Sequence, residues 1–172
     1  MWQRNDKQIR TKKQNVQCLS TQMGMIMIKI TVSGHPGSGT STLVDGLAKH
    51  FNIKSINGGQ IFRNAAKSRN LTLVEFGRIC EKDASIDRKL DDQLKQHIDG
   101  NQYAIVESRL AGWWAYQLKI KSIRIWLSVE EKERANRVVL REGITFDQAI
   151  KENSKRLKVD NQRYQKMYGV IP

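Results

Sequence analysis

A glycine-rich segment carries the residue types that bind phosphate. It directly follows an apolar run, Met25–Val32, and directly precedes a helical pattern. Glycines allow backbone N–H groups to converge on an anion, and the N-terminus of the following helix adds partial positive charge. This context predicts a loop that binds nucleotide phosphates, with the residues Gly34, His35, Pro36, Gly37, Ser38, Gly39, Thr40, Ser41 and Thr42.

The loop departs at one position from the G-x-x-x-x-G-K-[ST] pattern of phosphate-binding loops. Gly34 and Gly39 match the two glycines, Ser41 matches the hydroxyl that faces Mg²⁺, and Thr40 replaces the lysine. An ordinary turn is the alternative interpretation, because glycine, serine and threonine also favour turns that bind no ligand. The strand–loop–helix context favours phosphate binding, so the positive charge has to come from Lys49 or from arginines nearer the C-terminus.

A carboxylate ends a second apolar run. The segment Tyr103–Glu107 reads as a buried strand that delivers Glu107 to the sheet edge where the phosphate loop is expected. Carboxylate oxygens suit Mg²⁺, which keeps several of its waters in proteins. A strand that ends by chance in a surface glutamate is the alternative. Together with the phosphate loop, the segment favours a metal site that contains Ser41 and Glu107.

Arginines accompany both features. Arg63 follows Gly58–Gly59 closely, and Arg109 comes two residues after Glu107. Charge develops on oxygen atoms during phosphoryl transfer, and arginine offers a planar bidentate fork that stays charged. A solvated basic helix face is the alternative for the later arginines, although a break at residues 142–145 suits the hinge of a lid. These later residues are Arg134, Arg137, Arg141, Arg156 and Arg163.

Composition indicates one α/β domain with polyanionic partners. The chain has 172 residues, 39% of them hydrophobic, and a formal net charge of +13. This length supports a single core, and the charge suits either nucleic acid or nucleoside triphosphates. Cys18 and Cys80 lack disulfide or metal spacing, which favours the cytoplasm, and no run approaches the roughly 20 apolar residues of a membrane helix. We therefore expect no membrane association.

Residues 1–24 form a basic extension that we expect to be disordered, or to precede a start at Met23, Met25 or Met27. A secretory signal is excluded because Met25–Val32 contains Lys29 and runs into the glycine loop. The extension holds five basic residues and one acidic residue, so the remaining chain keeps a charge of +9. The basic character belongs to the domain itself.

Apolar periodicity predicts strands alternating with helices. The predicted strands are Met25–Val32, Asn52–Ile56, Tyr103–Val106 and Ile123–Val129. The predicted helices are Ser41–Phe51, Gln60–Ser68, Leu71–Glu81, Ser85–Ile98, Lys132–Arg141 and Thr145–Tyr168. Such alternation is typical of a parallel sheet with helices on both faces.

The chain from Met25 to Gly169 resembles the archaeal-type cytidylate kinases, which belong to the nucleoside monophosphate kinase group of P-loop kinases. The resemblance rests on several stretches taken together. These stretches are Ile30–Thr42, Asn57–Arg63, Leu73–Gly77, Ile86–Arg88, Val106–Trp113, Arg141–Ile144 and Arg163–Gly169.

The resemblance implies the α/β fold of a P-loop kinase, a three-layer sandwich in which helices cover both faces of a parallel sheet. It places an acceptor-binding region at about residues 57–100 and a lid at about 134–165, within one domain that spans residues 25–172. The family continues beyond the position of Pro172 through another strand and helix, so we expect an edge strand next to Ile123–Val129 to be missing. We expect a monomer.

The resemblance also implies an activity, namely in-line transfer of the ATP γ-phosphoryl group to CMP or dCMP with Mg²⁺. Arg63 and Arg109 fall at the family's acceptor-phosphate positions, and Glu107 falls at its metal-side acid. The catalytic lid arginines correspond to Arg141, Arg156 and Arg163. Asn57, Asp87 and Asp91 fall in the acceptor region, where a carboxylate can accept a hydrogen bond from the cytosine amino group. For the aspartates, a solvated acidic helix face is the alternative.

Two rival functions follow from the same residues. A related kinase with another acceptor, such as an adenylate kinase-like enzyme, would share the loop and the arginines. An inactive relative that binds nucleic acid would suit the net charge and Thr40. The absence of a basic patch interleaved with aromatic residues argues against this second rival, so we do not expect nucleic acid as the partner.

Overall fold

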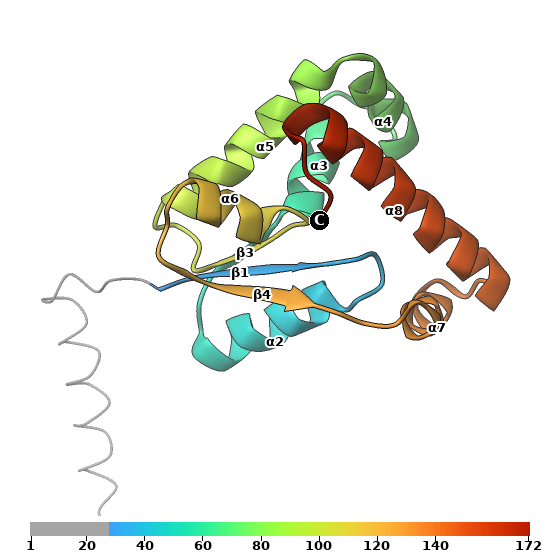
Figure 1. Cartoon of the computed structure of the whole chain (residues 1–172), viewed down its shortest axis with the longest axis horizontal. Helices are drawn as coiled ribbons and strands as arrows, with labels where there is room; N and C mark the ends of the chain where they lie inside the picture. The colour runs from blue at the N-terminus through green and yellow to red at the C-terminus, as the bar shows by residue number, and fades with distance from the viewer. Residues whose placement is uncertain (1–27) are drawn as a thin grey trace, which may run out of the picture.

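The computed structural model describes residues 28–172, so the predicted basic extension, residues 1–24, lies outside the described part (Figure 1). The strands are β1 (Lys29–Gly34), β2 (Ser55–Asn57), β3 (Ile105–Glu107) and β4 (Ser122–Leu127). The helices are α2 (Thr40–Phe51), α3 (Gly58–Lys67), α4 (Leu73–Lys82), α5 (Ala84–Asp99), α6 (Ala111–Gln117), α7 (Glu131–Glu142) and α8 (Phe146–Tyr168). Among residues 28–172, no helix is long and apolar enough to cross a membrane.

The four strands form one parallel sheet in the order β2-β3-β1-β4. In β1, one of the two inner strands, Thr31 pairs with Val106 of β3 on one side and with Arg124 of β4 on the other. Helix α2 covers one face of the sheet, and α5 and α6 cover the other (Figure 1). The predicted parallel sheet with helices on both faces is confirmed, and β2 and β4 are its edge strands within the described part.

Alternating residues of the buried strands serve two cores, because successive side chains point to opposite faces of a sheet. Val32 and Ile105 pack with Val44 of α2 on one face. Val106 packs with Ile98 of α5 and with the first turns of α6 on the other face. The inner strands are therefore covered on both faces, and the carboxyl ends of the parallel strands meet at one edge of the sheet.

Helix α6 is absent from the elements that the sequence predicts. It has seven residues, and Leu110 precedes it without a side-chain cap. The sequence has no capping residue before this helix, and the helix is too short to show a clear helical period of apolar residues. The helix forms because Ala111, Trp114 and Ala115 are buried against the sheet and α5. Packing against the sheet and α5 thus determines that α6 forms.

A buried lysine ties the start of the sheet to the end of α5. Lys29 lies at the first position of β1 and is 3% exposed. Its ammonium group donates hydrogen bonds to the backbone carbonyls of His97, Gly100 and Tyr103. Burial lowers the pKa of Lys29, and Asp99 opposes that shift. The lysine therefore acts as a cap for the last turn of α5 and for the turn that leads to β3.

Replacement of Lys29 should destabilise the fold. We expect Lys29→Met to lower the free energy of unfolding by about 3 kcal/mol, because it leaves three buried carbonyls without their charged donor. Urea unfolding of the purified protein measures the change. Lys121→Met, at an exposed lysine, is the control and should change the free energy by less than about 0.5 kcal/mol. Equal stability of the two variants would contradict the capping role.

Candidate active site

A cavity of about 690 Å³ opens where the carboxyl ends of the strands meet the α7–α8 pair. Its wall contains residues from the phosphate loop, from the end of β3 and from α3, α5, α7 and α8. Residues far apart in sequence thus share one site. The predicted site residues among the lining are Gly34, His35, Pro36, Gly37, Thr40, Ser41, Asn57, Arg63, Asp87, Glu107, Arg109, Arg141, Arg156 and Arg163.

Three predicted loop residues and three candidate cations, Lys49, Arg134 and Arg137, do not line this cavity. Ser38 is buried within the loop, and Gly39 adopts φ +85° as the residue that precedes α2. Thr42 is exposed on α2, and Lys49 is exposed in the last turn of the same helix. Lys49 therefore lies away from the place where the missing loop lysine would bring its charge.

Glu107 is the centre of the loop side of the cavity. This carboxylate is 7% exposed and accepts hydrogen bonds from the hydroxyls of Thr40, at 2.6 Å, and Ser41, at 2.9 Å, on one oxygen. Its other oxygen accepts a hydrogen bond from the Asn57 amide at 2.6 Å. The Thr40 hydroxyl thus occupies the lysine position as a donor to the carboxylate, without supplying a positive charge.

The oxygen atoms around Glu107 have the chemistry that Mg²⁺ prefers. A carboxylate and two hydroxyls are hard ligands, and Mg²⁺ commonly completes its octahedron with waters and nucleotide phosphates. No group of three or more His, Cys, Asp or Glu side chains suited to a metal occurs among residues 28–172. The residues present therefore fit a metal held mainly by nucleotide and water, with Ser41 and Glu107 on the protein side.

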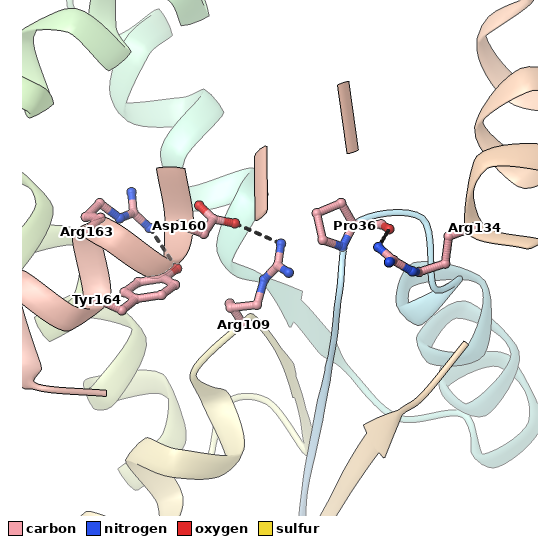
Figure 2. Close-up of polar contacts among 6 residues, drawn as sticks. All are labelled: Pro36, Arg109, Arg134, Asp160, Arg163 and Tyr164. Atoms are coloured by element: carbon pink, nitrogen blue, oxygen red, sulfur yellow. Dashed lines mark hydrogen bonds and ion pairs between the residues drawn. The ribbon is translucent and has the colours of Figure 1, made fainter. Parts of the chain in front are cut away.

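Two arginines line the opposite side, and each is paired with an aspartate. Arg109 donates to Asp160 of α8 at 2.8 Å, and its Nη1 atom is buried without a partner among the described residues (Figure 2). Arg163 lies 3.3 Å from Asp87 and donates to the Tyr164 hydroxyl at 2.7 Å. Burial lowers the pKa of Arg109, and Asp160 opposes the shift. Buried N–H groups without partners are suited to an anionic ligand.

On α5, Asp87 is buried and Asp91 is half-buried, so a solvated acidic helix face is the wrong interpretation for these two aspartates. Asp87 is 5% exposed, and burial raises its pKa although Arg163 opposes the shift. Asp91 accepts a hydrogen bond from the Tyr168 hydroxyl at 2.6 Å, and burial likewise raises its pKa. Both carboxylates therefore join α5 to α8 at the wall of the cavity.

Two arginines that the sequence analysis groups with the lid, Arg134 and Arg137, instead hold the phosphate loop in shape, a role that sequence reasoning missed. Arg134 of α7 is buried and donates to the carbonyls of Pro36 and Val129, each at 3.1 Å (Figure 2). Arg137, one turn later, donates to the Ser38 carbonyl at 2.9 Å. Both lie within the predicted lid range, and their three-residue spacing is a signal that they share a helix face.

The remaining predicted residues have local contacts. Arg63 folds back over the first turn of α3 and donates to the Gln60 side chain at 3.1 Å. The ring of His35 packs edge-on against Trp126, and burial, followed by Arg134 and Arg109, lowers the pKa of His35. Arg63 therefore lies next to the glycines that open α3, in the wall of the cavity.

A single methyl group in the loop should disrupt this arrangement. Gly37 has φ +81°, and a Cβ there would lie 2.7 Å from the Arg134 carbonyl oxygen. We expect Gly37→Ala to lower the free energy of unfolding by about 2 kcal/mol and to weaken ATP binding, because the loop must move away from α7. Urea unfolding and calorimetric titration with ATP measure the two effects.

Gly46→Ala is the matched control. Gly46 lies within α2, and nothing is found within 4 Å of a Cβ at that position. Alanine is the better helix former by about 1 kcal/mol, so this variant should be stabilised and should bind ATP unchanged. A loss of stability in both variants would argue against the loop-specific explanation.

Comparisons with known proteins agree with this geometry. Residues 30–160 match a family model described as an AAA domain. The chain is 41% identical over 141 residues to a cytidylate kinase from Halobacterium salinarum, covering 82% of this chain and 72% of the relative. It is 42% identical over 142 residues to a cytidylate kinase from Thermococcus kodakarensis, covering 82% and 71%.

Solved structures support the fold. A shikimate kinase from Bacteroides thetaiotaomicron has a TM-score of 0.54 at 15% identity, over 81% of this chain and 82% of that one. An uncharacterized protein from Eubacterium ventriosum has a TM-score of 0.61 at 17% identity, over 84% and 80%. The α/β kinase fold expected from the sequence is confirmed. By sequence identity over most of its length, the chain belongs to the cytidylate kinase family.

Proposed function

We propose that this protein transfers the γ-phosphoryl group of ATP to CMP or dCMP. One observation carries the proposal beyond family membership. A single cavity contains the phosphate loop with Glu107 on one side and two partly buried arginines, Arg109 and Arg163, on the other. Both arginines have an N–H without a partner in the described part of the chain. This arrangement can hold two phosphate-bearing ligands that face each other.

The donor side consists of the phosphate loop and the Glu107 cluster. Backbone N–H groups from Gly34 to Thr40 and the N-terminus of α2 would bind the ATP phosphates. Ser41 and Glu107 would hold Mg²⁺ directly or through water, with Asn57 and Thr40 fixing the carboxylate. When bound, Mg²⁺ neutralises charge on the oxygens of the transferred phosphoryl group.

The acceptor side consists of residues from α3, the end of β3 and α5. Arg63 and Arg109 would bind the phosphate of CMP, since both line the cavity and neither belongs to the phosphate loop. Asn57 and Asp87 would contact the rest of the acceptor, and a carboxylate can accept a hydrogen bond from the cytosine amino group. Transfer would proceed in line and directly from donor to acceptor. No covalent enzyme intermediate would form, so no cysteine or histidine nucleophile would be needed.

The lid of the proposal is the α7–α8 pair, about residues 134–165. Arg141, Arg156 and Arg163 line the cavity from this side and would act as the catalytic cations that the loop lacks at Thr40. Gly143 ends α7 with φ +68°, and Thr145 starts α8 with a capping box. This short, well-capped connection would let the two helices move together and exclude water from the phosphates.

The direct test is an acceptor panel. Purified protein with ATP and Mg²⁺ is offered CMP, dCMP, UMP and AMP separately, and ADP production is measured for each. We expect turnover with CMP or dCMP at least about 10-fold above that with AMP. Preference for AMP would contradict the proposed acceptor, and no turnover with any nucleotide from folded protein would contradict the kinase activity itself.

The proposal places this activity in the cytoplasm and in a monomer.

Loss of the Arg109 guanidinium should affect the acceptor selectively. We expect Arg109→Met to lower kcat/KM for CMP by about 100-fold or more, because one charge-assisted bidentate contact with the phosphate disappears. The KM for ATP should change by less than about 3-fold. Arg88→Met, at an exposed arginine of α5, is the control and should leave both parameters unchanged. Equal losses for CMP and ATP would argue against an acceptor role.

Replacement of Glu107 should appear in the Mg²⁺ dependence. We expect Glu107→Gln to raise the Mg²⁺ concentration for half-maximal activity by about 10-fold or more, since the carboxylate charge at the metal is lost. A titration of Mg²⁺ at saturating ATP and CMP measures this. Glu81→Gln, at an exposed glutamate of α4, is the control. An unchanged Mg²⁺ requirement in the Glu107 variant would remove this residue from the metal site.

A further inference from the structure

Among residues 28–172, three buried polar atoms without a hydrogen-bond partner belong to residues that line the cavity. Two are nitrogen atoms of Arg109 and Arg163, and the third is the hydroxyl oxygen of Ser108. The arginines are part of the function proposed above, but the hydroxyl has no role in it. A buried hydroxyl without a hydrogen bond costs free energy, so a native structure normally gives it a partner.

The backbone of Ser108 is fully used. Its N–H donates to the Val32 carbonyl at 3.2 Å, and its own carbonyl accepts from the Ala111 N–H at 3.3 Å. These contacts fix Ser108 between the last residue of β3, Glu107, and the acceptor-side arginine, Arg109. The side chain alone is left to make a contact, and rotation about one bond takes its hydroxyl between staggered positions.

The surroundings of Ser108 favour an anion. Its Cβ would lie 2.9 Å from a Cβ built on Gly58, which opens α3. A helix N-terminus carries partial positive charge, and the Arg63 guanidinium folds back over the same first turn. A Cβ at Gly59 would lie 3.3 Å from an Arg63 nitrogen. Ser108 thus lies against the start of α3, whose first turn also contacts Arg63, and it directly precedes Arg109 in the chain, so an O–H donor there suits a phosphate oxygen.

We propose that the Ser108 hydroxyl donates a hydrogen bond to the phosphate of the acceptor nucleotide. This inference rests on the proposed function, because it assigns the third donor to the acceptor site of Arg63 and Arg109. Ser108 would then be a substrate-binding residue that contacts the phosphate group, which CMP and dCMP share. No covalent bond to Ser108 forms or breaks, and the hydroxyl keeps its proton.

The test compares two serine variants of the full chain. Ser108→Ala keeps the Cβ that contacts Gly58 and removes only the hydroxyl. Ser122→Ala is the matched control, because the Ser122 hydroxyl is also buried without a partner in the described part, but it lies at the start of β4 and outside the cavity. Calorimetric titration with CMP alone measures affinity without requiring turnover.

We expect Ser108→Ala to weaken CMP and dCMP binding equally, by about 10-fold, and to leave ATP binding within about 2-fold of the parent protein. Without nucleotide, its urea unfolding midpoint should be no lower than that of the parent protein, because an unsatisfied hydroxyl has been removed. Ser122→Ala should match the parent protein in affinity for all three nucleotides. If the role of Ser108 were purely structural, Ser108→Ala would instead lower the urea unfolding midpoint and weaken the binding of all three nucleotides.

Several outcomes overturn the inference. Unchanged CMP affinity in Ser108→Ala contradicts it and leaves the proposed kinase function standing. A loss confined to CMP, with dCMP unaffected, also contradicts it, since the contact would then be with the 2′-hydroxyl of the sugar. Absence of CMP binding by the parent protein contradicts both the inference and the proposed acceptor.

Discussion

A single buried carboxylate joins the parts of the site. Glu107 ends β3 and accepts hydrogen bonds from the first turn of α2 and from Asn57, the residue that ends β2 and caps α3. Three segments from distant parts of the chain therefore meet on two oxygen atoms. Because a buried charge is stable only when its hydrogen bonds are satisfied, the phosphate loop and the start of α3 are both held in place by the Glu107 carboxylate.

The phosphate loop also depends on a second support, which comes from the lid side. Arg134 and Arg137 reach the Pro36 and Ser38 carbonyls from α7. In the familiar loop pattern a lysine places its charge among the phosphates, whereas here arginines hold the loop from outside by its carbonyl groups. Thr40, which replaces the lysine, is free to complete the hydrogen bonding of Glu107. The loop keeps its backbone donors available for a ligand.

The sequence predicted those parts of the fold and site that have a local signal. The glycine spacing at 34–42, the apolar run that ends in Glu107 and the alternation of strands and helices all lie within short windows. Helix α6 has no such signal because it depends on packing of Trp114. Lys29 and Arg134 act on backbone carbonyls, which every residue has, so no partner residue type reveals their role. Asp160 stayed unrecognised because its partner lies 51 residues away in the chain.

On the proposed acceptor role of Arg109, its pairing with Asp160 would link substrate recognition to the position of α8. Arg109 follows β3, whereas Asp160 and Arg163 lie on the long helix that reaches across the cavity (Figure 2). A phosphate that engages Arg109 competes with the carboxylate that holds this helix. Linkage requires the reverse effect of equal size, so any change that moves α8 away also alters the affinity of Arg109 for its anion. If Arg109 binds the acceptor as proposed, acceptor binding and movement of α8 would therefore be coupled through one electrostatic equilibrium.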